Sequence, residues 1–235
     1  YDIDDGSVQR FVLVPVAALQ EIFSDRAKVR GRTSETICPE FSCRYPCPAI
    51  PKREKITGET MPVDLGERQL MAIMVADVAE YCRLMHTDEA NTVTHLNSYK
   101  TIMTRKIDSH GGYVSDACGD NLMAEFMSAV NAVDCAVTIQ NRIEEENKRL
   151  PQTQRIHFRM GIHLGDVICR GPYLYGNTVN IAARLQSISE PGGIRISRAV
   201  YEQVEYQLKF EYCNLGERYV KNIPHPINVY RVGTK

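Results

Sequence analysis

The sequence contains no apolar stretch long enough to cross a membrane. Of its 235 residues 43% are hydrophobic, yet no run approaches the roughly 20 residues that a spanning helix needs. Residues 1–20 carry acidic side chains where the basic flank of a signal peptide belongs. We therefore expect neither a signal peptide nor a membrane partner.

An excess of charge of one sign is also missing. The 28 Lys and Arg residues nearly balance the 29 Asp and Glu residues, which leaves a formal net charge of −1. A general nucleic-acid-binding protein would carry a basic stripe. We expect no nucleic-acid partner, whereas a site for a small anion agrees with this composition.

The cysteines do not form a recognisable disulfide or zinc pattern. Five of the eight stand singly in periodic segments, where a free thiol serves as a small buried hydrophobe, namely Cys82, Cys118, Cys135, Cys169 and Cys213. This usage predicts a reducing, cytoplasmic environment. The other three, Cys38, Cys43 and Cys47 in "CPEFSCRYPC", match no standard zinc spacing and lack an obvious fourth ligand nearby, which disfavours a metal site there.

The length suits one folded domain with an extension. Residues 27–66 are rich in Pro, Gly, Thr and charge, a composition typical of an extended arm or linker. No internal repeat is present. We predict an N-terminal extension or linker over residues 1–66 and a folded domain over residues 67–235.

In the folded domain, apolar segments alternate regularly with turn and helix-breaking residues, and this pattern predicts the order β-α-β-β-α-β. The pattern indicates a buried strand over residues 71–77, a helical segment that "HGG" ends at about 109, and a hairpin over 113–126 with its turn near Gly119. A helix capped by Ser128 follows over 128–150, then one or two strands over 155–171 and another helix over 176–188. The remaining elements are a strand over 193–197, a helix from 198, and strands near 208–216 and 227–232. The order is that of the α+β ferredoxin-like motif, with added C-terminal strands and with helices packed on one face of an antiparallel sheet.

The stretch "GNTVNIAARL", residues 176–185, carries two stripes if it is a helix. Ile181, Leu185 and Ile188 would face a core, while Asn180, Arg184 and Ser187 would repeat the same spacing on another face. Most polar faces of this kind are only solvated. The rest of the sequence has to show whether an aligned amide and guanidinium have a function.

Two aspartates stand where carboxylates could converge. Asp77 in "VADVAEY" falls where an apolar strand ends, and Asp120 in "ACGDNLMAEF" falls in a hairpin turn after Gly119. Either one alone is more often a turn residue than a ligand. If the two strands are neighbours, both carboxylates can meet, and hard oxygen ligands suit Mg²⁺ or Mn²⁺ that carries phosphates.

A series of motifs resembles a known family. "MAIMVADVAEYCRLM", "GGYVSDACGDNLMAEF", "RMGIHLGDVI", "YGNTVNIAARLQSISEPGGIRIS" and "LGERYVKNIPHPINVYRV" resemble, in this order and at the right separations, the catalytic domain of class III nucleotidyl cyclases, especially a bacterial branch. The resemblance covers residues 70–232 and identifies residues 67–235 as the catalytic domain. It implies a phosphorus–oxygen lyase that converts a nucleoside triphosphate into a 3′,5′-cyclic nucleotide, a second messenger, and pyrophosphate.

The resemblance also implies a homodimer with active sites shared between subunits and two divalent cations, Mg²⁺ or Mn²⁺. In the family one protomer supplies the metal ligands, and the other supplies an asparagine and an arginine that act on the ribose and the transition state. A lysine contacts the β- and γ-phosphates. The matching residues here are Asp77, Asp120 and the backbone carbonyl of Val78 for the metals, Asn180 and Arg184 for catalysis, and Lys221 for the phosphates.

The positions that read the base depart from the pattern of the adenylyl members. Asp116 stands where these have a lysine, and Tyr173 stands where they have an aspartate, threonine or serine. An ionised Asp116 only accepts hydrogen bonds, and Tyr173 adds a bulky ring. A smaller pocket favours a pyrimidine, as in the cyclases of bacterial antiphage defence that make cyclic CMP or cyclic UMP. ATP and GTP stay open as alternatives, since guanylyl members often carry a glutamate at the position of Asp116.

Glu80 and His163 also stand at positions with two interpretations. Glu80 stands where the family usually has glycine, so its carboxylate would either repel the triphosphate or point to solvent. His163 alternates with apolar residues and is interpreted as a structural residue of a sheet. A degenerate domain that only dimerises or binds nucleotide is the main rival, but such a domain has no chemical reason to keep metal ligands and transition-state donors together.

Overall fold

The computed structural model describes residues 67–170, 173–221, 223 and 225–233. The predicted extension over residues 1–66, with Cys38, Cys43 and Cys47, lies outside the described residues. Among the helices that are described, none combines the length and the apolar character needed to cross a membrane.

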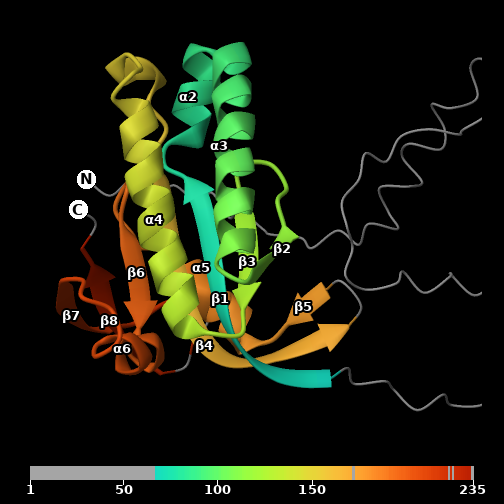
Figure 1. Ribbon diagram of the computed structural model, residues 1–235, viewed down its shortest axis with the longest axis vertical. Coiled ribbons are helices and arrows are strands. Elements are labelled where there is room, and N and C mark those ends of the chain that lie inside the picture. Colours follow the sequence, from blue (N-terminus) through green and yellow to red (C-terminus); the bar gives the residue numbers. More distant parts are fainter. Residues whose placement is uncertain (1–66, 171–172, 222, 224, 234–235) are drawn as a thin grey trace, which may run out of the picture. The chain divides into compact units, whose positions relative to one another are not determined.

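The described part is built on one sheet with the order β2-β3-β1-β4-β6-β8-β7 (Figure 1). Its strands are β1 Glu67–Val78, β2 Gly112–Asp116, β3 Leu122–Phe126, β4 Phe158–Arg170, β5 Tyr173–Tyr175, β6 Ile194–Ser197, β7 Tyr212–Arg218 and β8 Ile227–Val232. The long strands β1 and β4 pair antiparallel along the whole of β1, from Glu67 opposite Cys169 to Val78 opposite Phe158. The short strand β5 pairs with β4 outside this order.

The βαββαβ core with added C-terminal strands is confirmed, and the structure refines two details. The sheet is mixed, because β4 and β6 run parallel while the other pairs are antiparallel. These two strands are joined by a crossover through helix α5, Asn177–Ser187, and a connection of this kind gives a parallel pair. The two helices of the βαββαβ motif, α3 Glu89–Ser109 and α4 Ala129–Asn147, share one face of the sheet as predicted, and α5 packs on the opposite face.

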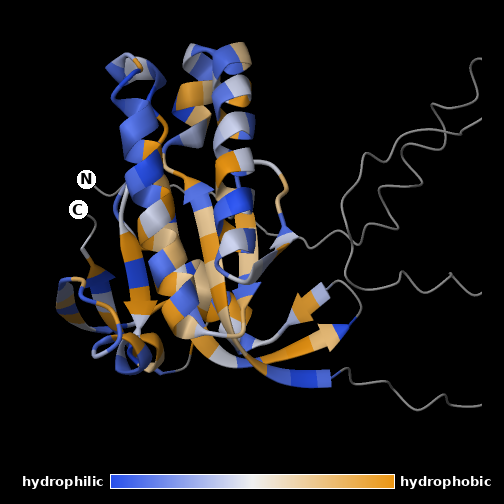
Figure 2. Cartoon of the chain, in the orientation of Figure 1, coloured by the Kyte–Doolittle hydropathy of each residue, from blue (hydrophilic) through white to orange (hydrophobic). Residues whose placement is uncertain are grey.

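Alternation along β1 explains how both faces become buried. Ala72, Met74 and Ala76 belong to the core under helices α3, Glu89–Ser109, and α4, Ala129–Asn147. The intervening residues, Met71, Ile73 and Val75, pack with Ala182 of α5. Figure 2 shows the corresponding concentration of apolar residues along the central strands. By the same alternation Asp77 points to the α5 side of the sheet.

The predicted helical segment before Ser109 is divided into two helices. Helix α2, Tyr81–Thr87, is followed by Asp88, whose side chain accepts a hydrogen bond of 3.2 Å from the backbone N–H of Asn91 and caps α3. Ser128 caps α4 in the same way, as predicted, with 3.3 Å to the N–H of Asn131. The remaining helices are the short 3₁₀ helix Gln152–Gln154 and α6, Arg198–Val204.

The apolar stripe predicted for α5 is buried only in part. Leu185 is fully buried, but Ile188 lies past the end of the helix and is 41% exposed, so the expected apolar stripe is only partly correct. The residues that α5 buries are Thr178, Ala182, Leu185 and Gln186. The approach to β4 is close, because a Cβ on Gly161 would lie 2.3 Å from the carbonyl oxygen of Ala182.

Candidate active site

The structure brings Asp77 and Asp120 to the same end of the sheet. Asp77 is the penultimate residue of β1, and Asp120 lies in the turn between β2 and β3, as the sequence predicts. Burial raises the pKa of the Asp77 carboxyl, and the negative charge of Asp120 raises it further. The two carboxylates are therefore close enough to repel each other, which is the arrangement that a cation would stabilise.

Arg159 on β4 is a site residue that the sequence analysis did not identify. It is the cross-strand neighbour of Asp77, with Nε donating to Oδ1 at 2.9 Å and Nη2 donating to Oδ2 at 2.6 Å. This paired contact lowers the pKa of Asp77 and opposes the effect of burial. The signal in the sequence is a lone arginine between Phe158 and Met160, two residues that are fully buried.

Helix α5 presents different residues to Asp77 and to solvent. The Gln186 side chain, on the buried face, faces Asp77 and lowers the pKa of the Asp77 carboxyl, and among the described residues the Gln186 Nε2 is buried without a hydrogen-bond partner. Arg184 precedes Gln186 by two residues, so it points roughly 200° away around the helix. Asn180 lies one turn before Arg184 on the same face and is exposed. Within the described residues, neither the Asn180 nor the Arg184 side chain has a hydrogen-bond or ion-pair partner.

The turn that carries Asp120 is tied to helix α3. The Lys100 ammonium group donates hydrogen bonds to the carbonyl oxygens of Ala117, at 2.8 Å, and Gly119, at 2.5 Å. Gly119 adopts a left-handed conformation with φ of 59°, which favours glycine at this position. Lys100, like Arg159, is absent from the set of site residues predicted from the sequence.

The two predicted base readers are not brought together by the sheet register. Asp116 ends β2 at the level of Val75, whereas Tyr173 pairs with Arg170 beyond the Glu67 end of β1. Both side chains are exposed. In the part of the chain that the structure covers, no hydrogen bond connects them, and their role in reading a base stays a prediction.

The remaining predicted site residues, Lys221 and Val78, differ in their exposure to solvent. Lys221 is exposed between β7 and β8, and two residues near it, 222 and 224, lie outside the described residues. Val78 is buried at the end of β1, one residue after Asp77. No contact given by the structure joins Lys221 with the carboxylates, so its assignment also stays a prediction.

Glu80 adopts an unusual backbone conformation beside the site. Its φ of 56° and ψ of 34° place it in the left-handed region, where it precedes α2. Its carboxylate is paired with Arg83 at 2.6 Å, and both side chains are more than half exposed. Of the two alternatives from the sequence, the structure supports a side chain that points to solvent.

The chemistry of these residues fits a magnesium or manganese site completed by substrate. Among the described residues no three His, Cys, Asp or Glu side chains are grouped to hold an ion. Two carboxylates with a nearby backbone carbonyl instead suit a hard cation that takes its other ligands from water and phosphates. Asp77, Asp120 and the carbonyl of Val78 would supply the protein's share.

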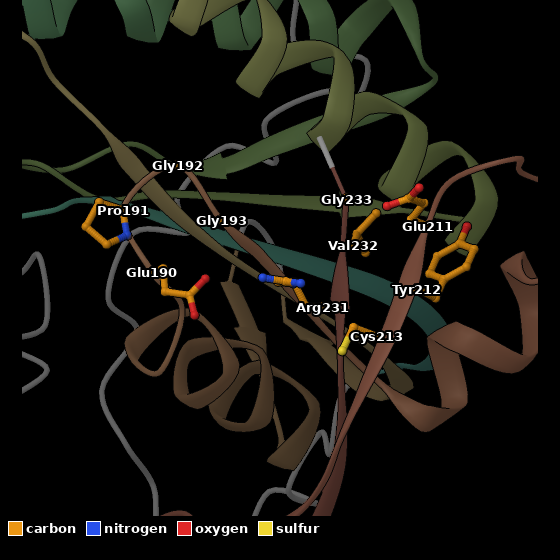
Figure 3. A pocket seen from close by; sticks show the side chains of 10 residues that line it. All are labelled: Glu190, Pro191, Gly192, Gly193, Glu211, Tyr212, Cys213, Arg231, Val232 and Gly233. Atoms are coloured by element: carbon orange, nitrogen blue, oxygen red, sulfur yellow. The ribbon is translucent and has the colours of Figure 1, made fainter. Parts of the chain in front are cut away.

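A separate cavity of about 690 Å³ lies between the loop after α5 and the residues of β7 and β8 (Figure 3). Its lining includes Glu190, Glu211, Cys213 and Arg231. None of the predicted site residues lines it. Size alone therefore does not locate the chemistry in this chain.

The comparison with protein families decides what this arrangement is. The family model of the adenylate and guanylate cyclase catalytic domain matches residues 63–233. The chain belongs to this family. The fold and the enzyme class inferred from the motifs, a class III nucleotidyl cyclase domain and a phosphorus–oxygen lyase, are thereby confirmed.

Relatives of this cyclase domain occur among curated proteins and solved structures. The chain is 37% identical over 164 residues to the putative adenylate cyclase 3 of Rhizobium meliloti, which covers 69% of this chain but only 28% of that protein. A crystal structure of an adenylate/guanylate cyclase/hydrolase from Silicibacter pomeroyi is 36% identical and covers 71% of this chain and 98% of that one, with a TM-score of 0.64. The adenylyl cyclase CyaB of P. aeruginosa, at 24% identity, covers 72% of this chain and 96% of that one; with a TM-score of 0.64 it shares the fold.

Proposed function

We propose that this domain forms a homodimer in which each active site takes its metal ligands from one subunit and its transition-state donors from the other. The observation that carries the proposal is the orientation of α5. Gln186 faces Asp77, while Asn180 and Arg184 point away from it and have no partner in the described part of the chain. A second copy, with its own α5 turned toward these carboxylates, would complete the site.

The reaction that this site would perform is an intramolecular phosphoryl transfer. The ribose 3′-hydroxyl attacks the α-phosphorus in line and loses its proton to water, a new O–P bond forms, and the bond from the α-phosphorus to the oxygen that bridges to the β-phosphorus breaks as pyrophosphate leaves. Two divalent cations held by Asp77, Asp120 and the Val78 carbonyl would lower the pKa of the hydroxyl and neutralise the phosphates. Arg159, already beside Asp77, adds a permanent positive charge where the phosphates would bind.

The partner subunit's Arg184 would donate to the α-phosphoryl oxygens, where negative charge grows in the transition state. The partner subunit's Asn180 would orient the ribose, and Lys221 would bind the β- and γ-phosphates. Donors aimed at developing charge are worth about 10²- to 10³-fold in rate. Arg184→Ala should therefore reduce kcat far more than it changes KM.

Mixing two inactive variants tests the shared site. Asp120→Ala and Arg184→Ala should each be inactive alone, because every site of either homodimer lacks one group. Random exchange makes half of the dimers heterodimers, and each rebuilds one of two sites, so about a quarter of wild-type activity should return. If subunits exchange, as shown by mass spectrometry of differently tagged copies, and activity stays absent, the shared site is wrong.

The metal ligands can be tested without removing the core. Asp77→Asn keeps the size of the side chain and one acceptor for Arg159, but it removes the negative charge. We expect loss of nearly all turnover with an unchanged circular dichroism spectrum. Arg68→Gln, at the exposed start of the same strand, is the matched control and should stay active. Activity above a few per cent in Asp77→Asn would contradict the assignment.

We further propose that the base is a pyrimidine, with CTP or UTP preferred over ATP and GTP. The support is chemical: Asp116 offers only an acceptor when ionised, and Tyr173 presents an exposed ring, so neither supplies the contacts that adenylyl members use. Incubation with each of the four ribonucleoside triphosphates and Mn²⁺, followed by mass spectrometry, tests this. Preference for ATP over both pyrimidine nucleotides would return the domain to the adenylyl branch.

The two base readers are tested separately, because the register places them far apart in one chain. Tyr173→Ala should admit purines, whereas Asp116→Asn should change the choice among bases that carry donors. A cyclic pyrimidine nucleotide would serve as a second messenger, and by resemblance we propose a cytoplasmic role in antiphage defence. Phage plating on cells that express wild-type or Asp77→Asn protein would test that role.

A further inference from the structure

We propose that Lys100 is a positioning residue for Asp120. Its ammonium group holds the turn between β2 and β3 in place, and this turn directs the Asp120 carboxylate toward the metal site. The inference rests on the proposed function, since it takes Asp120 as a metal ligand. The inference gives a role to a residue of helix α3, and neither the motifs nor the proposed mechanism includes any residue of that helix.

The geometry joins one side chain to two points of the turn. Lys100 Nζ lies 2.8 Å from the carbonyl oxygen of Ala117 and 2.5 Å from that of Gly119. These carbonyls are separated by one residue, and the second precedes Asp120 directly. The residue next to Lys100, Tyr99, is buried in the core, so the lysine projects from a fixed helix. One ammonium shared by two carbonyls therefore sets the curvature of the chain just before Asp120.

The turn has little else to hold it. Inside it, Asp116 Oδ1 accepts from the N–H of Cys118 at 3.2 Å, and the carbonyl oxygen of Cys118 accepts from the N–H of Asn121 at 3.1 Å. The pairing of β2 with β3 shifts register between Val114 and Asp116. Among the described residues, Lys100 is the one side chain from outside the hairpin that hydrogen-bonds to the backbone of this turn.

The charges around Lys100 agree with a role beside the carboxylates. Burial lowers the pKa of its ammonium group, and the negative charge of Asp120, the largest opposing effect, raises it. The ammonium is thus partly removed from water, and its two carbonyl partners compensate for that loss. Its charge also offsets part of the repulsion between Asp120 and Asp77.

Manganese binding in the absence of nucleotide tests the inference without relying on turnover. We would titrate Mn²⁺ into the purified full chain and follow free ion by electron paramagnetic resonance, for wild type, Lys100→Met, Lys100→Arg and Arg105→Met. Outer-shell partners of metal ligands change affinity by about 10- to 100-fold, so Lys100→Met should bind at least about tenfold more weakly. Arg105→Met, an exposed position on the same helix, should match wild type, and Lys100→Arg should recover most of the loss.

Several outcomes would overturn the inference. Wild-type Mn²⁺ affinity in Lys100→Met would do so, and so would a loss that Lys100→Arg fails to reduce, because the lost property would then not be a cationic donor. If Lys100→Met does not fold by circular dichroism, Lys100→Gln replaces it, since one amide donor should give an intermediate affinity. Full Mn²⁺ affinity in a folded Lys100→Gln would also overturn it.

Cyclisation assays separate this inference from the proposed function. At saturating nucleotide, Lys100→Met should need about tenfold more Mn²⁺ for half-maximal rate and should approach the wild-type kcat at high Mn²⁺. An active wild type with unchanged Mn²⁺ dependence in Lys100→Met refutes only the positioning role. A wild type whose Mn²⁺ affinity depends on Lys100 but which cyclises no nucleotide refutes only the proposed function.

Discussion

At the scale of single residues, the candidate site depends on two contacts between distant parts of the chain, Arg159 with Asp77 and Lys100 with the turn before Asp120. Asp77 and Asp120 are found because each follows a local signal, an apolar run or a glycine turn. Arg159 was missed because its contact with Asp77 spans 82 positions and depends on the register of β1 against β4. Lys100 was missed for the same reason, since a lysine on a helix gives no sign that it reaches a distant turn.

The strained backbone at Glu80 yields a stability prediction. A residue with a Cβ pays about 1 kcal/mol in the left-handed region, and glycine does not. Glu80→Gly should therefore raise the free energy of unfolding by about that amount, measured by urea denaturation. The exposed pair with Arg83 contributes too little to reverse the sign.

The same substitution in an ordinary helix provides the control for Glu80. Glu144 is exposed within α4, where glycine costs about 1 kcal/mol. Glu144→Gly should lower the free energy of unfolding. If both variants shift in the same direction, the strain assigned to Glu80 has no measurable effect.

His163 should make the domain less stable in mild acid. Burial lowers the pKa of its ring to about 4, and its Nδ1 lies 2.7 Å from the hydroxyl oxygen of Ser197. Between pH 6.5 and 4 the unfolded chain binds a proton that the folded chain does not, so the free energy of unfolding falls as pH falls, by up to about 3 kcal/mol.

Denaturation across that pH window measures the effect of His163. His163→Asn removes the titrating ring, so the slope of stability against pH should become shallower between pH 4 and 6.5. His86→Asn, at an exposed position of α2, should leave the slope unchanged. An unaltered slope in His163→Asn would contradict the neutral, buried ring.

At the scale of elements, local chemistry predicted helices well where a cap was recognised. The cap of α4 at Ser128 is predictable from the sequence, whereas the pattern before Ser109 predicts one continuous helix and does not indicate the cap at Asp88. The face of α5 was harder to predict. Spacing placed Ile188 in the core, but the helix ends at Ser187 and buries Ala182 and Gln186 instead, since Gly161 allows the backbones of β4 and α5 to approach closely.

Gly161 should therefore be intolerant of any side chain. Its Cβ would lie 2.1 Å from the backbone nitrogen of Gln186 and 2.3 Å from the carbonyl oxygen of Ala182, and backbone atoms cannot rotate away. We expect Gly161→Ala to lower the free energy of unfolding by about 1 to 3 kcal/mol and to speed amide exchange along α5. Thr94→Ala, at an exposed position of α3, should leave α5 unaffected. Equal exchange in both variants would contradict this close packing.

At the scale of the whole domain, the order of elements was predictable and the placement of layers was not. Hydrophobic period and turn residues gave the β-α-β-β-α-β order, because these signals are local. The parallel pairing of β4 with β6 and the position of α5 on the opposite face depend on a crossover, which no local pattern specifies. The site depends on that placement, since it decides which residues of α5 meet Asp77.

The pairing of β1 with β4 also determines how long β1 stays without its partner strand during synthesis. Ribosomes add about 5 to 20 residues each second, so Arg159 emerges roughly 4 to 16 seconds after Asp77. Until then the apolar strand that ends in Asp77 has no partner along the edge that β4 will fill, and exposed edges of this kind promote aggregation. Chains that stop before β4 should therefore pellet on centrifugation when complete chains stay in the supernatant. The central strand that later supports the chemistry is therefore a segment exposed to aggregation while the chain is being made.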